Sequence, residues 1–241
     1  MPFLKNGHRN IKVSEMSKNS DIQDEKSISK ETPSLPLTAL VLCGGKSERM
    51  GRPKAFLPYQ GTTMVGYILS TVRNLFTEVF LVTNEPELYE DLGVDVVKDI
   101  LPHRGPLGAI LSGLLVANNQ HSFVFACDMP FIDKKLVRKM CGSRENNDVL
   151  VLAHQNGIEP LIGIYSKNCI KPLEESLFAG DSSLQEFVST LNAKAFFYEE
   201  FSRVQGTEVI PPYFNIDTPQ DYSRALTRSV YDIRQFLNKS Y

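Results

Sequence analysis

The chain has 241 residues, of which 42% are hydrophobic and 22% are charged, and 26 basic against 28 acidic side chains give a formal net charge of -2. This composition is typical of a globular protein with one large or two small domains, and it excludes a fibrous or wholly disordered chain. A near-neutral chain without a long Lys/Arg run gives no support for a nucleic-acid partner. It also lacks the run of about 18 apolar residues that would cross a membrane.

The composition changes near residue 37. Residues 1–36 hold nine hydrophobic and eleven charged side chains, too few apolar groups to offset the chain entropy lost on folding. They lack the apolar centre of a secretory signal, and their acidic residues argue against a transit peptide. We therefore expect a disordered polar leader over residues 1–36 and a single domain over residues 37–241. The four cysteines form no CxxC pair and indicate reduced thiols in a cytoplasmic protein.

Short apolar runs alternate with helical periods along the first half of the domain. The apolar runs predict buried strands at 37–43, 79–83, 94–97, 123–127 and 149–153. Between them, apolar residues at helical spacing predict three helices. Two of them are marked by one apolar face each: Met64, Ile68, Val72, Leu75 and Phe76 in the first, and Leu107, Ile110, Leu111, Leu114 and Leu115 in the second. The third covers residues 134–140, with Asp133 as its N-cap. The alternation predicts an α/β, Rossmann-like, three-layer fold with a mainly parallel sheet and helices on both faces.

The alternation loosens after residue 155. Here we expect strands at 161–165, 195–198 and 213–216, and helices at 169–178 and 184–191. The last helix is marked by Thr218 as N-cap and Pro219 at its first position.

The loop after the first strand has the composition of a phosphate-binding loop. It reads Gly44-Gly45-Lys46-Ser47-Glu48-Arg49-Met50-Gly51-Arg52-Pro53-Lys54. The paired glycines let backbone N–H groups approach phosphate oxygens, and Ser47, Arg49 and Lys54 add donors and positive charge. It is not a Walker A loop, because Leu40 stands where that motif needs glycine.

This loop resembles the LxGGxSxRMGxxK signature of MobA-type nucleotidyltransferases. The resemblance continues through short matches over roughly residues 37–226: Val82-Thr83-Asn84, Asp99 with Gly105-Pro106-Leu107-Gly108, Cys127-Asp128-Met129-Pro130, Glu159-Pro160-Leu161 and Asn215-Ile216-Asp217-Thr218-Pro219. It implies transfer of GMP from GTP to the phosphate of molybdopterin, with Mg²⁺ and release of pyrophosphate. Transient contact with proteins that handle this cofactor is a further expectation.

Two carboxylates are candidate metal ligands. Asp128 ends a predicted strand at the edge of the sheet where ligands bind, and Mg²⁺ takes one or two carboxylates together with phosphate oxygens. By resemblance, Asp128 holds the metal and lies against GTP, while Asn215 and Asp217 face the acceptor phosphate or a second metal. The alternatives are helix capping by Asp128 and a dipole interaction of Asp217 with the last helix.

Other loop residues are candidates for binding GTP. By resemblance, Asn84 and Asp99 contact it, and the backbone of Leu42, Cys43, Gly44 and Gly45 cradles it. The alternatives are a turn-forming role for Asn84 and a solvated loop carboxylate at Asp99.

The expected chemistry needs no base, because the acceptor is already an anion. Arg49, Lys54 and a metal on Asp128 would align the reactants and stabilise charge that moves toward pyrophosphate. Arg52-Pro53-Lys54 also resembles cytidylyltransferases acting on the same cofactor, whereas the paired Gly44-Gly45 resembles the guanylyl enzymes. Transfer to a sugar or alcohol phosphate, and GTP binding without catalysis, are the remaining alternatives.

Overall fold

The computed structural model describes residues 12–13, 34–44, 53–180, 183–198 and 210–227. The strands are β1 (Lys12–Val13), β2 (Leu35–Cys43), β3 (Pro58–Tyr59), β4 (Thr62–Thr63), β5 (Phe76–Thr83), β6 (Asp95–Lys98), β7 (His121–Ala126), β8 (Val149–His154), β9 (Gly157–Ser166) and β10 (Ala193–Phe197). The α-helices are α1 (Met64–Arg73), α2 (Gly105–Val116), α3 (Lys134–Gly142), α4 (Ile170–Ala179) and α5 (Leu184–Thr190), and residues 219–227 are also helical. Short 3₁₀ helices are η1 (Lys54–Phe56), η2 (Pro86–Leu88), η3 (Glu90–Leu92) and η4 (Lys167–Cys169).

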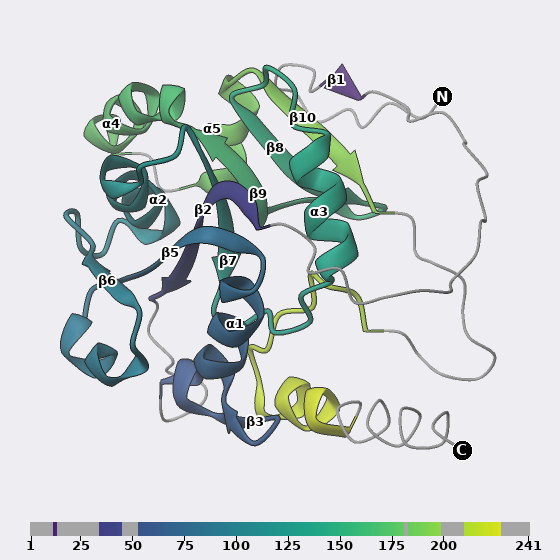
Figure 1. The fold of residues 1–241 in the computed structure, drawn as a ribbon. Coiled ribbons are helices and arrows are strands. Elements are labelled where there is room, and N and C mark those ends of the chain that lie inside the picture. Colours follow the sequence, from purple (N-terminus) through teal and green to yellow (C-terminus); the bar gives the residue numbers. More distant parts are fainter. Residues whose placement is uncertain (1–11, 14–33, 45–52, 181–182, 199–209, 228–241) are drawn as a thin grey trace.

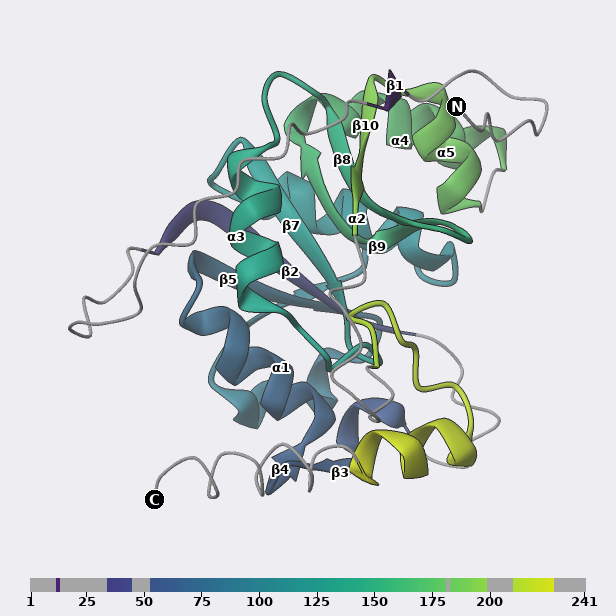
Figure 2. The same cartoon turned by 90° about the vertical axis from the view of Figure 1, so that its right-hand side faces the viewer.

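An eight-stranded sheet forms the centre of the protein, in the order β1-β10-β8-β9-β7-β2-β5-β6 (Figure 1). Neighbouring strands run parallel except at β9, which is antiparallel to both β7 and β8. Helices α1 and α3 lie over one face of the sheet, and α2, α4 and α5 lie over the other (Figures 1 and 2). The α/β fold with a mainly parallel sheet is therefore confirmed.

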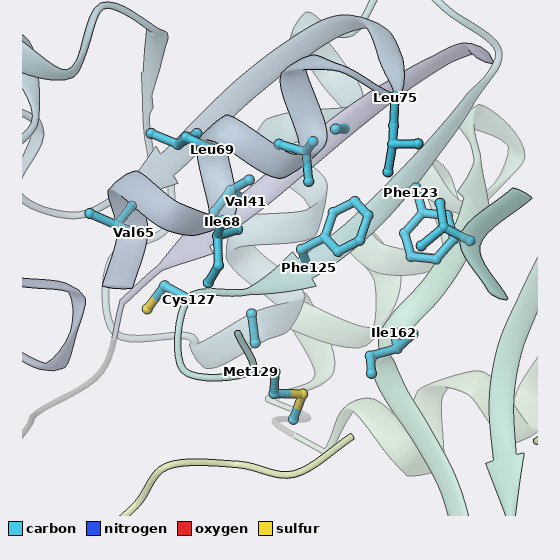
Figure 3. Packing of buried hydrophobic residues seen from close by; sticks show 14 of the residues in the cluster. Val41, Val65, Ile68, Leu69, Leu75, Phe123, Phe125, Cys127, Met129 and Ile162 are labelled. Atoms are coloured by element: carbon cyan, nitrogen blue, oxygen red, sulfur yellow. The ribbon is translucent and has the colours of Figure 1, made fainter. Parts of the chain in front are cut away.

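The central strand β2 is buried on both faces, as its continuous apolar run predicts. Its consecutive residues Leu40 and Val41 enter separate hydrophobic clusters on the two sides of the sheet. On the α1 side, Ile68 and Val41 pack with Phe123 and Phe125, whose rings stack with centroids 4.5 Å apart (Figure 3). Burying each such side chain contributes about 1.5–3 kcal/mol. The carboxyl end of β2 is thus held by packing on both faces of the sheet.

Two segments differ from the prediction. The first helix ends at Arg73, and Phe76 begins β5 instead of lying on the helix, because Phe76 pairs with Leu35 of β2. Residues 213–216 form no strand in the described structure. The Phe214 N–H donates to the Pro211 carbonyl and forms a turn, instead of a hydrogen bond to a neighbouring strand.

Near the N-terminus, β1 pairs with β10, and β2 begins at Leu35, within the stretch assigned to the leader. The division of the chain at residue 37 stays a prediction. Within the described ranges, no helix has the length and apolar character needed to span a membrane.

Candidate active site

The candidate site lies where the parallel strands end. Because β2, β5, β6 and β7 run in the same direction, the residues that follow them meet at one edge of the sheet: Gly44, Asn84, Asp99 and Asp128. The first residues of β9 reach the same edge, because this strand is antiparallel to its neighbours.

Lys54 lies between two carboxylates at this edge. Its Nζ is 2.5 Å from Asp217 Oδ1 and 3.4 Å from Asp128 Oδ2. Lys54 opens η1, which is anchored by the buried side chains of Ala55 and Leu57. The side chains of Lys54 and Asp128 are only 16% and 23% exposed. The arrangement is a partly buried cation held by two anions.

Backbone contacts bring Asp217 to this position. Ile216 is fully buried, and its N–H donates to the Asp128 carbonyl at 3.0 Å. The predicted N-cap is confirmed, since Thr218 Oγ1 accepts from the Asp221 N–H and Asp221 Oδ2 accepts from the Thr218 N–H. Asn215 Nδ2 donates to Asp217 Oδ2 at 2.9 Å. Asp217 is therefore fixed both by the helix start and by the Asp128 loop.

Burial and neighbouring charges determine the protonation states of Lys54 and Asp128. Burial raises the pKa of the Asp128 carboxyl above its ordinary value, and the Lys54 ammonium lowers it only in part. Burial lowers the pKa of Lys54, but the hydrogen bond to Asp217 and the charge of Asp128 raise it by more, so the net shift is upward. Lys54 is therefore charged at neutral pH, and a further cation would favour the ionised form of Asp128.

The donor set fits Mg²⁺ bound together with phosphates. Asp128 and Asp217 are two carboxylates joined by one lysine. No group of three or more His, Cys, Asp or Glu side chains in the described part of the chain could enclose a metal. Mg²⁺ needs only one or two carboxylates when phosphate oxygens and waters complete its shell. Asp128 and Asp217 could therefore hold Mg²⁺ only together with a phosphate ligand.

Asn84 and Asp99 follow strands on the other side of β2 from Asp128. Asn84 Oδ1 is buried without a hydrogen-bond partner among the described residues, a state that is costly unless a ligand supplies a donor. Asp99 is only 4% exposed, so the alternative of a solvated loop carboxylate is wrong. Its Oδ1 accepts from Leu101 N–H and Ser112 Oγ, each at 3.0 Å, and fixes the loop to α2.

The remaining predicted residues lie at the end of β2 and in the loop that follows it. Leu42 and Cys43 are buried at the end of β2, and Gly44 follows them. Burial raises the pKa of the Cys43 thiol, so this thiol is protonated and a poor nucleophile. Gly45 and Arg49 lie outside the described residues, and their roles stay predictions.

Gly108 sets the distance between α2 and the loop that carries Asp99. A Cβ at this position would lie 2.9 Å from the Leu101 carbonyl oxygen and 3.2 Å from Asp99 Oδ1. We expect Gly108→Ala to lower the free energy of unfolding by about 1–3 kcal/mol, because the loop must move. Urea unfolding measures this change. Gly142→Ala at the end of α3 is the control, because that Cβ would meet no described atom within 4 Å. Equal stability of the two variants would contradict the expectation.

Glu159 of β9 had no assigned role in the sequence interpretation, although it belongs to the Glu159-Pro160-Leu161 match. Burial raises the pKa of its carboxyl, the Leu161 N–H lowers it in part, and the charge of Asp128 raises it further. Because β9 is the neighbour of β7 in the sheet, Glu159 lies on the strand next to the one that leads to Asp128.

Comparisons with known proteins give one consistent result. Residues 39–195 match the family model described as the MobA-like NTP transferase domain. The chain is 35% identical over 191 residues to a probable molybdenum cofactor guanylyltransferase of Carboxydothermus hydrogenoformans, covering 79% of this chain and 95% of that protein. A relative of the same name from Clostridium perfringens is 34% identical, covering 77% of this chain and 93% of the relative.

A solved structure shares the fold. Molybdopterin-guanine dinucleotide biosynthesis protein A of Archaeoglobus fulgidus superposes with a TM-score of 0.69 at 23% sequence identity, covering 81% of this chain and all of that one. At this sequence identity, the similarity establishes a shared fold and nothing more.

Proposed function

Because the chain belongs to the MobA-like NTP transferase family, we propose that it is a molybdenum cofactor guanylyltransferase. It transfers GMP from GTP to the phosphate of molybdopterin and releases pyrophosphate. The names of the curated relatives support guanylyl over cytidylyl transfer. The observation that carries the proposal is Lys54, held between Asp128 and Asp217 directly after the predicted phosphate-binding loop.

The reaction needs alignment and charge stabilisation. An oxygen of the acceptor phosphate attacks the α-phosphorus of GTP and forms a new P–O bond. The bond between the α-phosphorus and the oxygen that bridges to the β-phosphate breaks, and its electron pair leaves with pyrophosphate. No proton has to be removed from the acceptor, so a general base is unnecessary. Lys54 lies at the carboxylate pair, where it can bind the α-phosphate and stabilise the charge that develops there.

Asp128, with Asp217 beside it, would hold Mg²⁺. When bound, the metal would neutralise phosphate charge and help to orient the triphosphate. Asn84 and Asp99 would border the guanine. Asn84 Oδ1 is a buried acceptor without a partner among the described residues, and guanine offers N–H donors on one edge. Asn215 and Asp217 would lie toward the acceptor phosphate, with Arg49 and Gly45 of the loop at the triphosphate.

The test is pyrophosphate release by the full chain with molybdopterin and Mg²⁺, with GTP and CTP in parallel. We expect release with GTP, at least about tenfold faster than with CTP, together with formation of the guanine dinucleotide. Release with CTP alone would identify a cytidylyltransferase, and GTP binding without turnover on any acceptor would identify a binding module. Either result would overturn the proposal.

A further inference from the structure

One part of the sheet edge has no role in the proposed binding of GTP. Pairing between β7 and β9 stops at Val124 and Gly163, whereas β7 pairs with β2 as far as Ala126. The beginning of β9 separates from β7 and pairs with β8, where Glu159 lies opposite Leu152. Glu159 is thus on the opposite side of Asp128 from the strands that lead to Asn84 and Asp99.

An aromatic stack borders the same region. The rings of His154 and Tyr213 stack with centroids 4.1 Å apart and an interplanar angle of 9°. Tyr198 contacts Tyr213 edge to face, with ring centroids 6.0 Å apart. His154 ends β8, Tyr198 follows β10, and Tyr213 precedes Asn215 by two residues. The stack therefore adjoins the segment that carries Asn215.

His154 and Glu159 lie on one face of the sheet. Leu152 is opposite Glu159 and His154 is opposite Gly157, and alternate residues of a strand share a face. The two side chains are diagonal neighbours across an antiparallel pair, a separation that long side chains and rings can bridge. A Cβ at Gly157 would meet no described atom within 4 Å. The described residues therefore leave space on the surface beside His154.

Two side chains of this region keep hydrogen-bond acceptor capacity that the described residues do not use. Glu159 receives a hydrogen bond from the Leu161 N–H at 3.3 Å and forms no salt bridge with a described residue. Asn215 Oδ1 is buried and lacks any partner among the described residues. A ligand that fits here needs a flat ring for stacking and adjacent N–H donors for a carboxylate.

We propose that Glu159, His154 and Tyr213 bind the pterin ring of the acceptor. The ring extends the His154–Tyr213 stack, and the Glu159 carboxylate accepts from the ring N–H and the amino group of the 2-amino-4-oxopyrimidine edge. This inference rests on the proposed function. Guanine has the same donor edge, so the experiment must separate a pterin site from a second contact to GTP.

The first variant is Glu159→Gln, which keeps the size of the side chain and replaces one acceptor oxygen with a donor. We expect the KM for molybdopterin to rise about 10–100-fold, as for loss of hydrogen bonds to a charged group, with the KM for GTP unchanged within twofold. Glu174→Gln on α4 is the matched control, because Glu174 is exposed on the opposite face. His154→Ala should raise the KM for molybdopterin about 3–10-fold, and His154→Phe should restore it through stacking.

A binding experiment does not depend on turnover. The full-length wild type and each variant are titrated with 6-hydroxymethylpterin, followed by pterin fluorescence, and separately with GTP. We expect Glu159→Gln to weaken pterin binding at least tenfold and to leave GTP binding unchanged. Weaker GTP binding with unchanged pterin binding would assign Glu159 to the donor and overturn the inference, as would no change in either. If the wild type binds the pterin but gives no pyrophosphate with molybdopterin and GTP, the proposed function fails and the pterin site stands.

Discussion

Lys54→Ala is expected to lower the turnover number by about 10²–10³-fold, equivalent to about 2.7–4 kcal/mol of transition-state stabilisation. The substitution removes the ammonium that Asp128 and Asp217 hold in place, so the charge developing on the phosphates loses a preorganised partner. It also leaves two carboxylates close together without that cation, which weakens triphosphate binding. Steady-state pyrophosphate release at saturating GTP and molybdopterin measures the change.

Two further variants make the Lys54 result specific. Lys171→Ala removes a lysine that is 84% exposed on α4, and its turnover should equal that of the wild type. Lys54→Arg keeps the charge, but its planar guanidinium cannot reproduce the short contact to Asp217, so we expect partial activity. A loss of less than threefold in correctly folded Lys54→Ala would show that this ammonium plays no part in transfer.

Asp128→Asn should lower turnover by at least about 10²-fold, because an amide of the same size lacks the charge needed to hold a divalent cation. Asn can still accept a hydrogen bond from Lys54, so the fold should be retained. The Mg²⁺ concentration required for half-maximal activity should rise, since Asp217 would remain as the single charged ligand. Titration of activity against Mg²⁺ measures both effects.

Asp91→Asn is the control for this substitution, because Asp91 lies exposed in η3. Its turnover and Mg²⁺ dependence should match those of the wild type. Unchanged turnover and an unchanged Mg²⁺ requirement in Asp128→Asn would exclude Asp128 as a metal ligand and leave it as a structural partner of Lys54.

Much of the fold could be predicted from local patterns. The continuous apolar run of β2 predicts a strand buried on both faces, and Asp133 accepts from the Lys135 and Leu136 N–H groups as the predicted cap of α3. The prediction is wrong where a distant segment decides the conformation. Phe76 fits a helical period, yet it becomes a strand residue because Leu35 pairs with it.

In the candidate site, too, local patterns predict some features, whereas contacts between distant segments decide others. The spacing of residues after each strand predicts that Asn84, Asp99 and Asp128 share one edge of the sheet, because parallel strands end together. Spacing does not predict that Asp99 is buried against Ser112, because that contact depends on how closely α2 packs on the loop. Nor does it predict a role for Glu159, because a carboxylate near the start of an antiparallel strand is recognised only once that strand is placed beside Asp128.

The sequence by itself determined where most of the strands and helices lie along the chain and which residue types are available for charge stabilisation, because these depend on local pattern and side-chain chemistry. Only the tertiary structure decided that Lys54 is shared by Asp128 and Asp217 and that His154 stacks on Tyr213. These contacts join residues far apart in the chain. Their geometry is set by the packing of the whole sheet and its helices, which no local pattern contains.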